Sequence, residues 1–215
     1  HYVVSLVPEI SPSTLFYSII AGIAFGLCAI LFTQSLHRLT AIVANKISFP
    51  PLRPFLGGIL IAAVVLAIGT TKYIGLGIPI IESAFHQELP SYDFILKLLF
   101  TVVTLSVGFK GGEVTPLFFI GATLGNALTY VLPLPIGLLS GMGFVAVFSG
   151  ATHTPIACTV MGMELFGIES GLFIGIACLV SYLFSGMKGI YSPQLIGGIK
   201  GKIYQSFKKS TFENL

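Results

Sequence analysis

One short run of the sequence combines the residue types that anion binding needs: Gly111-Gly112-Glu113-Val114-Thr115-Pro116. Glycines let the backbone turn tightly and let its N–H groups approach a ligand. Thr115 followed by Pro116 predicts a helix start, with Thr115 as the N-cap and Pro116 as the first helical residue. A helix N-terminus attracts anions because it carries unpaired N–H donors and a partial positive charge. The run predicts an anion site; a plain capped loop is the structural alternative.

Glu113 is the carboxylate of this run, and the sequence leaves its charge state open. Burial would favour the protonated form, which can carry a proton, whereas a helix N-terminus favours the ionised form. A carboxylate among apolar helices is costly and usually functional. Lys110 either pairs with Glu113 or lies at the membrane surface.

Two further places pair a hydroxyl residue with proline, as helix starts do. In Tyr191-Ser192-Pro193 the Tyr191 hydroxyl would lie beside a helix N-terminus and donate to an anion. Taken by itself, Tyr191 fits an interfacial tyrosine better. In His153-Thr154-Pro155 the histidine is expected to cap a helix or to anchor at an interface. Glu164 follows in the same apolar run, and a structural role is favoured for it over a functional one.

The composition indicates which class of protein positions these residues. Charged residues make up 9% of the 215 and hydrophobic residues 54%, which is too few charges for the surface of a soluble domain. The 25 glycines fit close helix packing in lipid. The net charge of +3 is scattered, so nucleic acid is not expected as a partner. The three cysteines are too far apart for a metal site, and we expect no cofactor.

The apolar pattern predicts an all-α integral membrane protein. Helices are expected over 13–43, 52–68, 80–88, 92–107, 116–132, 135–148, 155–166, 170–184 and 193–207, with loops at 108–115 and 149–154. Several of these are shorter than the ~20 residues that cross a bilayer. Short helices interrupted by Gly and Pro are typical of broken helices whose ends form a binding site.

Charge and length suggest an orientation and a division of the chain. Lys and Arg gather between the first two helices and near the C-terminus, which places both on the cytoplasmic side. We divide the chain into an extramembrane segment (1–12), a transmembrane unit (13–207) and a cytoplasmic tail (208–215). Because the sequence begins at His1 without Met, we expect it to be part of a longer polypeptide.

The run from Gly108 to Gly125 resembles the second-half anion motif of the CLC chloride channel and transporter family. Most members have Gly-x-Phe-x-Pro there, whereas Gly112-Glu-Val-Thr-Pro116 resembles the fluoride-selective branch, whose members are fluoride/proton antiporters. Gly141-Met-Gly143 and Tyr191-Ser192 resemble later motifs of the family in the right order.

This resemblance implies roles for individual residues. Glu113 and Thr115 would be specific to the fluoride branch, and Glu113 would couple transport to protons. Val114 would contribute a backbone N–H to the central site, beside Gly112, and Tyr191 would contribute its hydroxyl. Short donors suit fluoride, because it is a small and strong hydrogen-bond acceptor.

The resemblance also implies that this chain is the second of two inverted halves. The missing N-terminal half would supply a Gly-x-Glu-x-Pro loop with a gating glutamate. Family members are homodimers with one pore per subunit, and residues 155–184 resemble part of that interface. A bacterial inner membrane is the expected location.

Three alternatives to fluoride/proton antiport stay open. The first is a chloride transporter or voltage-gated chloride channel, against which the Glu113 motif argues. The second is an inactive half-length fragment that inserts without transporting. The third is an intramembrane enzyme that uses Glu164 and His153, but no metal-ligand spacing or nucleophile–base pair supports it, so we expect no enzymatic activity.

Overall fold

The computed structural model describes residue 4, residues 6–191 and residues 200–201, and every structural statement below concerns these residues. This part of the chain is helical and contains no β-strand. Its elements in chain order are α1 (Pro12–Lys46), α2 (Leu52–Ile68), α3 (Ile78–Ala84), α4 (Asp93–Ser106), α5 (Val114–Leu128), α6 (Ile136–Thr152), α7 (Pro155–Phe166), the 3-10 turn η1 (Ile168–Ser170) and α8 (Gly171–Phe184).

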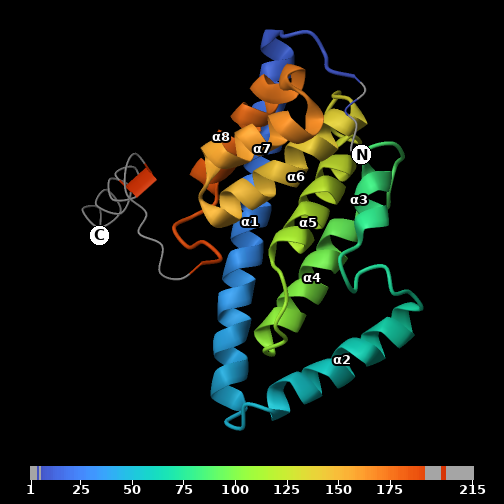
Figure 1. Ribbon diagram of the computed structural model, residues 1–215, viewed down its shortest axis with the longest axis vertical. Helices are drawn as coiled ribbons and strands as arrows, with labels where there is room; N and C mark the ends of the chain where they lie inside the picture. Colours follow the sequence, from blue (N-terminus) through green and yellow to red (C-terminus); the bar gives the residue numbers. More distant parts are fainter. Residues whose placement is uncertain (1–3, 5, 192–199, 202–215) are drawn as a thin grey trace.

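Helix α1 runs along the long axis of the molecule (Figure 1). Its first turn is fixed by a capping box, in which the Ser11 hydroxyl accepts from the Thr14 amide and the Thr14 hydroxyl accepts from the Ser11 amide. Its 35 residues measure about 52 Å at 1.5 Å each. Among the described helices only α1 is both long and apolar enough to cross a bilayer.

The remaining apolar helices are too short to cross a bilayer at full length. Helices α2, α5, α6 and α7 have between 12 and 17 residues, against the ~20 that a bilayer requires. This confirms the expectation of several short helices. Helices that end at membrane depth are tolerated only where their ends are buried in protein or line a wet cavity.

Helices α5 and α6 pack against each other through glycines. A Cβ atom on Gly121 would overlap the carbonyl of Gly143, and a Cβ atom on Gly125 would overlap the carbonyl of Leu139. Because none is present, the two backbones touch directly, as small residues allow in membrane helices. Phe118 of α5 then stacks on Phe144 of α6, with 4.1 Å between ring centroids.

Helix α8 is held to α1 and α6 by small residues and buried hydroxyls. Gly26 of α1 lies against the backbone of Ser181 and the side chain of Phe184. The Ser181 hydroxyl donates to the Ala146 carbonyl of α6 at 2.6 Å, and Ser149 donates to the Cys178 carbonyl at 3.1 Å. All three cysteines are buried packing residues.

Helix α3 is tied to α5 by the side chain of Asn126, which is fully buried. Its amide nitrogen donates to the carbonyls of Ala84 and Gln87, both at 2.8 Å, and its oxygen accepts from the Leu89 amide at 2.9 Å. A buried amide that makes all of these bonds fixes a unique packing.

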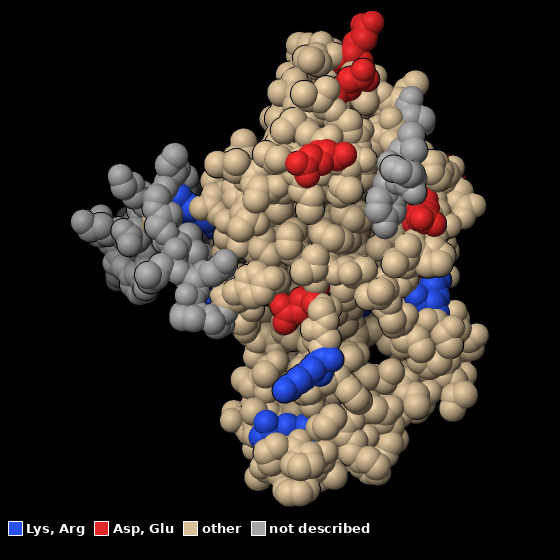
Figure 2. Space-filling view, in the orientation of Figure 1, with Lys and Arg blue, Asp and Glu red and all other residues tan. Residues whose placement is uncertain are grey.

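Helix α2 stands apart from the rest, and most of its apolar side chains are exposed (Figure 1). Figure 2 shows only scattered charged side chains on this face of the molecule, between wide uncharged areas. A surface of this kind is matched by lipid or by protein rather than by water.

The structure changes several of the expected helix boundaries. The helix expected over 80–88 occupies Ile78–Ala84, and the helix expected over 13–43 runs from Pro12 to Lys46. The helix expected over 135–148 continues to Thr152, so most of the expected 149–154 loop is helical. It ends at His153, whose left-handed backbone (φ 59°) terminates it. The helix expected over 116–132 occupies Val114–Leu128 instead. The expected 193–207 helix and the 208–215 tail lie outside the described residues, apart from the helical pair 200–201.

The contact between α5 and α6 predicts the effect of a single methyl group. We expect Gly121→Ala to destabilise the protein by at least about 1–3 kcal/mol, because two packed backbones would have to separate. Gly58→Ala is the matched control, since a Cβ there would make only an ordinary contact with the Phe109 ring. Thermal unfolding in detergent measures both, and an equal midpoint for the two variants would contradict the prediction.

Candidate functional site

Helix α5 begins close to the predicted helix start, but two residues earlier. The helix begins at Val114 with Glu113 as its N-cap, and the Leu117 amide donates to the Glu113 carbonyl at 3.3 Å. The expectation that Thr115 is the N-cap and Pro116 the first helical residue is therefore wrong. Proline is tolerated anywhere in the first turn because the N–H that it lacks has no acceptor there.

The side chains of this turn are half-buried and have no recorded protein partner. Glu113, Val114 and Thr115 are all of intermediate exposure. Neither the Glu113 carboxylate nor the Thr115 hydroxyl makes a hydrogen bond to another described residue. Cβ atoms on Gly111 and Gly112 would meet nothing within 4 Å. The turn therefore presents a carboxylate, a hydroxyl and free backbone amides to a ligand.

Helix α5 is too short to cross a bilayer from its first turn to its last. Its 15 residues measure about 22 Å, which is less than the ~30 Å hydrocarbon core. The residues immediately after the first turn, Pro116 and Leu117, are buried. Unpaired amides next to buried residues attract an anion more strongly than they would in bulk water.

A cavity of about 720 Å³ reaches this turn from the side of α2. Gly111, Gly112 and Pro116 line one end of it, and Lys97 of α4 forms part of its wall. Lys97 is 1% exposed, and its ammonium donates to the carbonyls of Tyr73 (3.1 Å) and Gly75 (2.6 Å). The cavity that leads to the turn thus has a positive charge in its wall.

A buried carboxylate stands one helical turn before Lys97. Asp93 is fully buried, forms an ion pair with Lys72 and accepts a hydrogen bond from the Tyr73 hydroxyl at 2.7 Å. The group of Lys72, Asp93 and Lys97 carries one net positive charge. It therefore favours anions near the α5 turn.

Two hydrogen bonds hold the segment after α8 that leads to Tyr191. The Ile190 amide donates to the Ala151 carbonyl of α6, and His37 of α1 donates from Nε2 to the Gly189 carbonyl, both at 2.9 Å. These two bonds fix the backbone immediately before Tyr191. Tyr191 itself is 49% exposed.

His37 connects the two parts of the predicted site. It holds Gly189 directly and lies within electrostatic range of the Glu113 carboxylate. No hydrogen bond between Tyr191 and residues 112–115 is recorded in the described part of the chain. Ser192 and Pro193, the expected start of the next helix, lie outside the described residues.

Among the described residues, no hydrogen bond joins the other polar residues singled out in the sequence to this turn. Glu164 is exposed on α7. His153 ends α6, and its Nδ1 is 3.0 Å from the ammonium of the buried Lys200. Thr154 and Pro155 do begin α7 as expected, although the Thr154 side chain makes no capping bond. The described residues contain no cluster of three metal-ligating side chains.

Sequence reasoning missed His37, Lys97 and Asp93. The signal for the last two was present, because ionisable residues inside an apolar helix are rare and usually functional. His37 gave no such signal, because it lies where α1 was expected to emerge into water.

The fold and the site define a class of protein. This class is the helical membrane proteins with short helices and a helix start that favours anions. The sequence matches the family described as Voltage gated chloride channel over residues 1–186. The chain therefore belongs to the voltage-gated chloride channel (CLC) family.

Curated relatives and a solved structure agree with this assignment. The chain is 52% identical to the Chloride/fluoride channel protein of Pseudomonas syringae pv. tomato over 206 residues, covering 93% of this chain and 46% of the relative. It is 30% identical to the voltage-gated ClC-type chloride channel ClcB of Escherichia coli O9:H4, covering 76% and 42% respectively. The crystal structure of a CLC-type fluoride/proton antiporter superposes with a TM-score of 0.85 at 34% identity, covering 88% of this chain and 48% of that one.

These similarities establish a partial CLC-type membrane fold. The chain spans about half the length of the curated relatives that it matches. Those relatives are ion channels and transporters, and the all-α fold expected from the sequence is confirmed.

Proposed function

We propose that the polypeptide containing this chain exports fluoride across a bacterial inner membrane in exchange for protons. The observation that carries this proposal is the first turn of α5, where Glu113 and Thr115 stand with free side chains beside unpaired amides. Two similarities support the choice of ion. A 52% identical relative is named a chloride/fluoride channel protein, and the structural neighbour is a fluoride/proton antiporter.

The chemistry of the turn suits a small anion. The amides near Gly112 and Val114 offer N–H donors, and the Thr115 hydroxyl offers an O–H donor. Fluoride is the halide that gains most from short hydrogen bonds, and each bond to a charged partner contributes ~1.5–3 kcal/mol. Tyr191 would add its hydroxyl from the opposite side.

Glu113 is the group that we assign to proton coupling. A carboxylate next to a bound anion is repelled when ionised, and protonation relieves this repulsion. Anion binding and proton binding at the turn therefore favour each other, so the occupancy of one ion depends on that of the other.

The complete transporter in this proposal needs more than this chain. A missing N-terminal half would supply the other side of the anion site and a gating glutamate. A homodimer is also proposed, because α7 and α8 expose apolar side chains that no described residue covers: Ile156, Val160, Leu172, Leu179 and Leu183. If the natural polypeptide has only these residues, an inactive fragment is the alternative.

Chloride transport is the second candidate. It is favoured by the ClcB relatives, whose names specify a chloride channel, although their identity to this chain is 28–30%.

Proteoliposomes containing the full natural polypeptide test the proposal directly. Vesicles loaded with fluoride should release it faster than vesicles loaded with chloride, and the external pH should rise as protons enter. Protein-free vesicles control for the passage of hydrogen fluoride. Equal or faster chloride efflux would reject fluoride preference, and fluoride efflux without a pH change would reject coupling. Residues 1–215 alone should give no efflux.

In the same assay we expect Glu113→Gln to lower proton-coupled fluoride transport at least about tenfold, because a positioned acid–base group contributes ~10²-fold or more. Glu164→Gln is the matched control, since it removes an exposed carboxylate from α7. Unchanged flux and stoichiometry in Glu113→Gln would remove this residue from the coupling mechanism.

Thr115→Val keeps the shape of the side chain and deletes its hydroxyl. We expect the fluoride-to-chloride preference to fall by roughly tenfold, which corresponds to one charge-assisted hydrogen bond. Thr159→Val is the control, because the Thr159 hydroxyl donates to the Pro155 carbonyl within its own helix. Measured efflux ratios that match the wild type would place Thr115 outside the site.

A further inference from the structure

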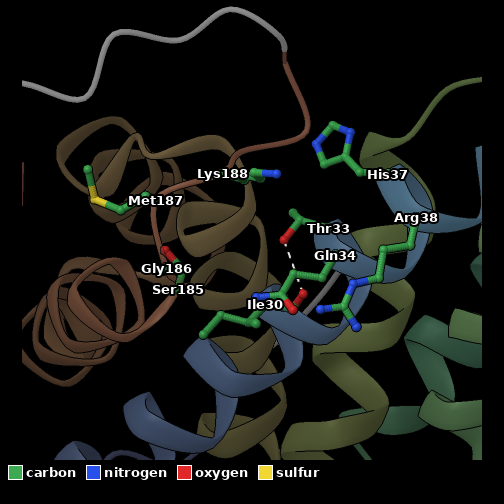
Figure 3. Close-up of a pocket in the computed structure, with 9 residues that line it drawn as sticks. All are labelled: Ile30, Thr33, Gln34, His37, Arg38, Ser185, Gly186, Met187 and Lys188. Carbon is green, nitrogen blue, oxygen red and sulfur yellow. Dashed lines mark hydrogen bonds between the residues drawn. The ribbon is translucent and has the colours of Figure 1, made fainter. Parts of the chain in front are cut away.

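A second polar cavity lies between α1 and the segment that follows α8. It measures about 330 Å³, and Figure 3 shows the residues that line it. Thr33, Gln34, His37 and Arg38 come from one stretch of α1, and Lys188 comes from the opposite wall. No carboxylate lines it. The cavity is therefore a positively charged pocket outside the α5 turn.

The two cations of the pocket lack acidic partners in the described part of the chain. Among the described residues, the ion pair joins Lys72 to Asp93, and both of these residues lie outside the pocket. Neither Arg38 nor Lys188 has a described carboxylate within 4 Å. The Lys188 ammonium points toward His37, and the Arg38 guanidinium lies beside Gln34 (Figure 3). Gathering like charges around one cavity is unfavourable. A bound anion offsets that repulsion.

The remaining hydrogen-bonding capacity of the pocket indicates what kind of anion fits. Thr33 already donates to the Ala29 and Ile30 carbonyls, and His37 already donates from Nε2 to Gly189. Donors are left on Arg38, Lys188 and the Gln34 amide. A planar guanidinium binds two oxygens of one group, and an ammonium adds a point charge. Together they match a phosphate better than a single-atom halide.

The position of the pocket along α1 indicates where the phosphate comes from. The apolar part of α1 ends at Leu36, so the pocket lies at the depth where lipid headgroups begin. Exposed apolar side chains adjoin it: Leu31 of α1, Phe184 of α8 and Met187. Phe184 also packs beside Gly26, where α1 and α8 meet. An acyl chain would lie along this apolar surface while the headgroup enters the pocket.

We propose that this pocket binds the phosphate group of an acidic phospholipid. The juxtaposition of Arg38 and Lys188 across a cavity at the polar end of the apolar part of α1 carries the proposal. Basic pockets between membrane helices on the cytoplasmic side are suited to such headgroups. The bound lipid would join α1 to the segment that His37 holds, two residues before Tyr191.

Lipid retention by the full natural polypeptide tests this without any transport measurement. The protein is purified in neutral detergent with phosphatidylglycerol or phosphatidylcholine, and bound lipid is counted by native mass spectrometry. We expect phosphatidylglycerol to be retained preferentially. Arg38→Gln and Lys188→Gln should each weaken its retention by about fivefold, since one basic residue near the surface contributes ~1 kcal/mol. The failure of fluoride transport would leave this result unaffected.

Lys46→Gln is the matched control, because it removes one exposed positive charge from the same helix outside the pocket. This variant should retain phosphatidylglycerol to within about twofold of the wild type. Size-exclusion elution verifies folding, and Lys188→Gln decides the matter if Arg38→Gln aggregates. Wild-type retention in both pocket variants would overturn the proposal. Binding of inorganic phosphate to the lipid-free protein, without retention of phosphatidylglycerol, would also overturn the proposal.

Discussion

The direct backbone contact between α5 and α6 is the constraint on which the rest of this structure depends. Gly121 and Gly125 let α5 lie against the carbonyls of Gly143 and Leu139. Because two backbones in contact cannot slide without separating, the position of the first turn of α5 relative to α6 is fixed. That turn carries Glu113 and Thr115, so the glycine contact sets the position of the proposed anion site.

Helix α1 is the second element that organises the structure, because it contacts both α8 and the segment that follows α8. Near its middle, Gly26 and its neighbours accept α8 at close distance. Directly after its apolar part, His37 holds the Gly189 carbonyl and lies near Glu113. A single long helix thus sets the position of the α5 turn relative to the segment that leads to Tyr191. The proposed lipid pocket uses the same stretch of α1, where Arg38 lies beside His37.

Large apolar surfaces and a wide cavity remain open in this chain, which spans about half the length of the curated relatives that it matches. Helix α2 and the outer faces of α7 and α8 expose large apolar side chains, and a wide cavity separates α2 from the α5 turn. The buried group of Lys72, Asp93 and Lys97 keeps one positive charge in the wall of that cavity. In the proposed transporter, the other half would close the site from the side on which the turn of α5 is open.

Sequence alone determined the membrane class, the short helices and the run that carries the site, because composition, periodicity and Gly-Pro punctuation are local properties. It also indicated the CLC family through motifs in order. It placed the start of α5 two residues late, since Pro116 is accepted at several positions of a first turn. It also ended α6 too early, since that helix continues through Gly150 to Thr152 and ends at His153. Only the tertiary structure brought His37 to Gly189 and Lys188 to Arg38. Those pairs are about 150 residues apart, and no local pattern encodes which distant segments helix packing will make neighbours.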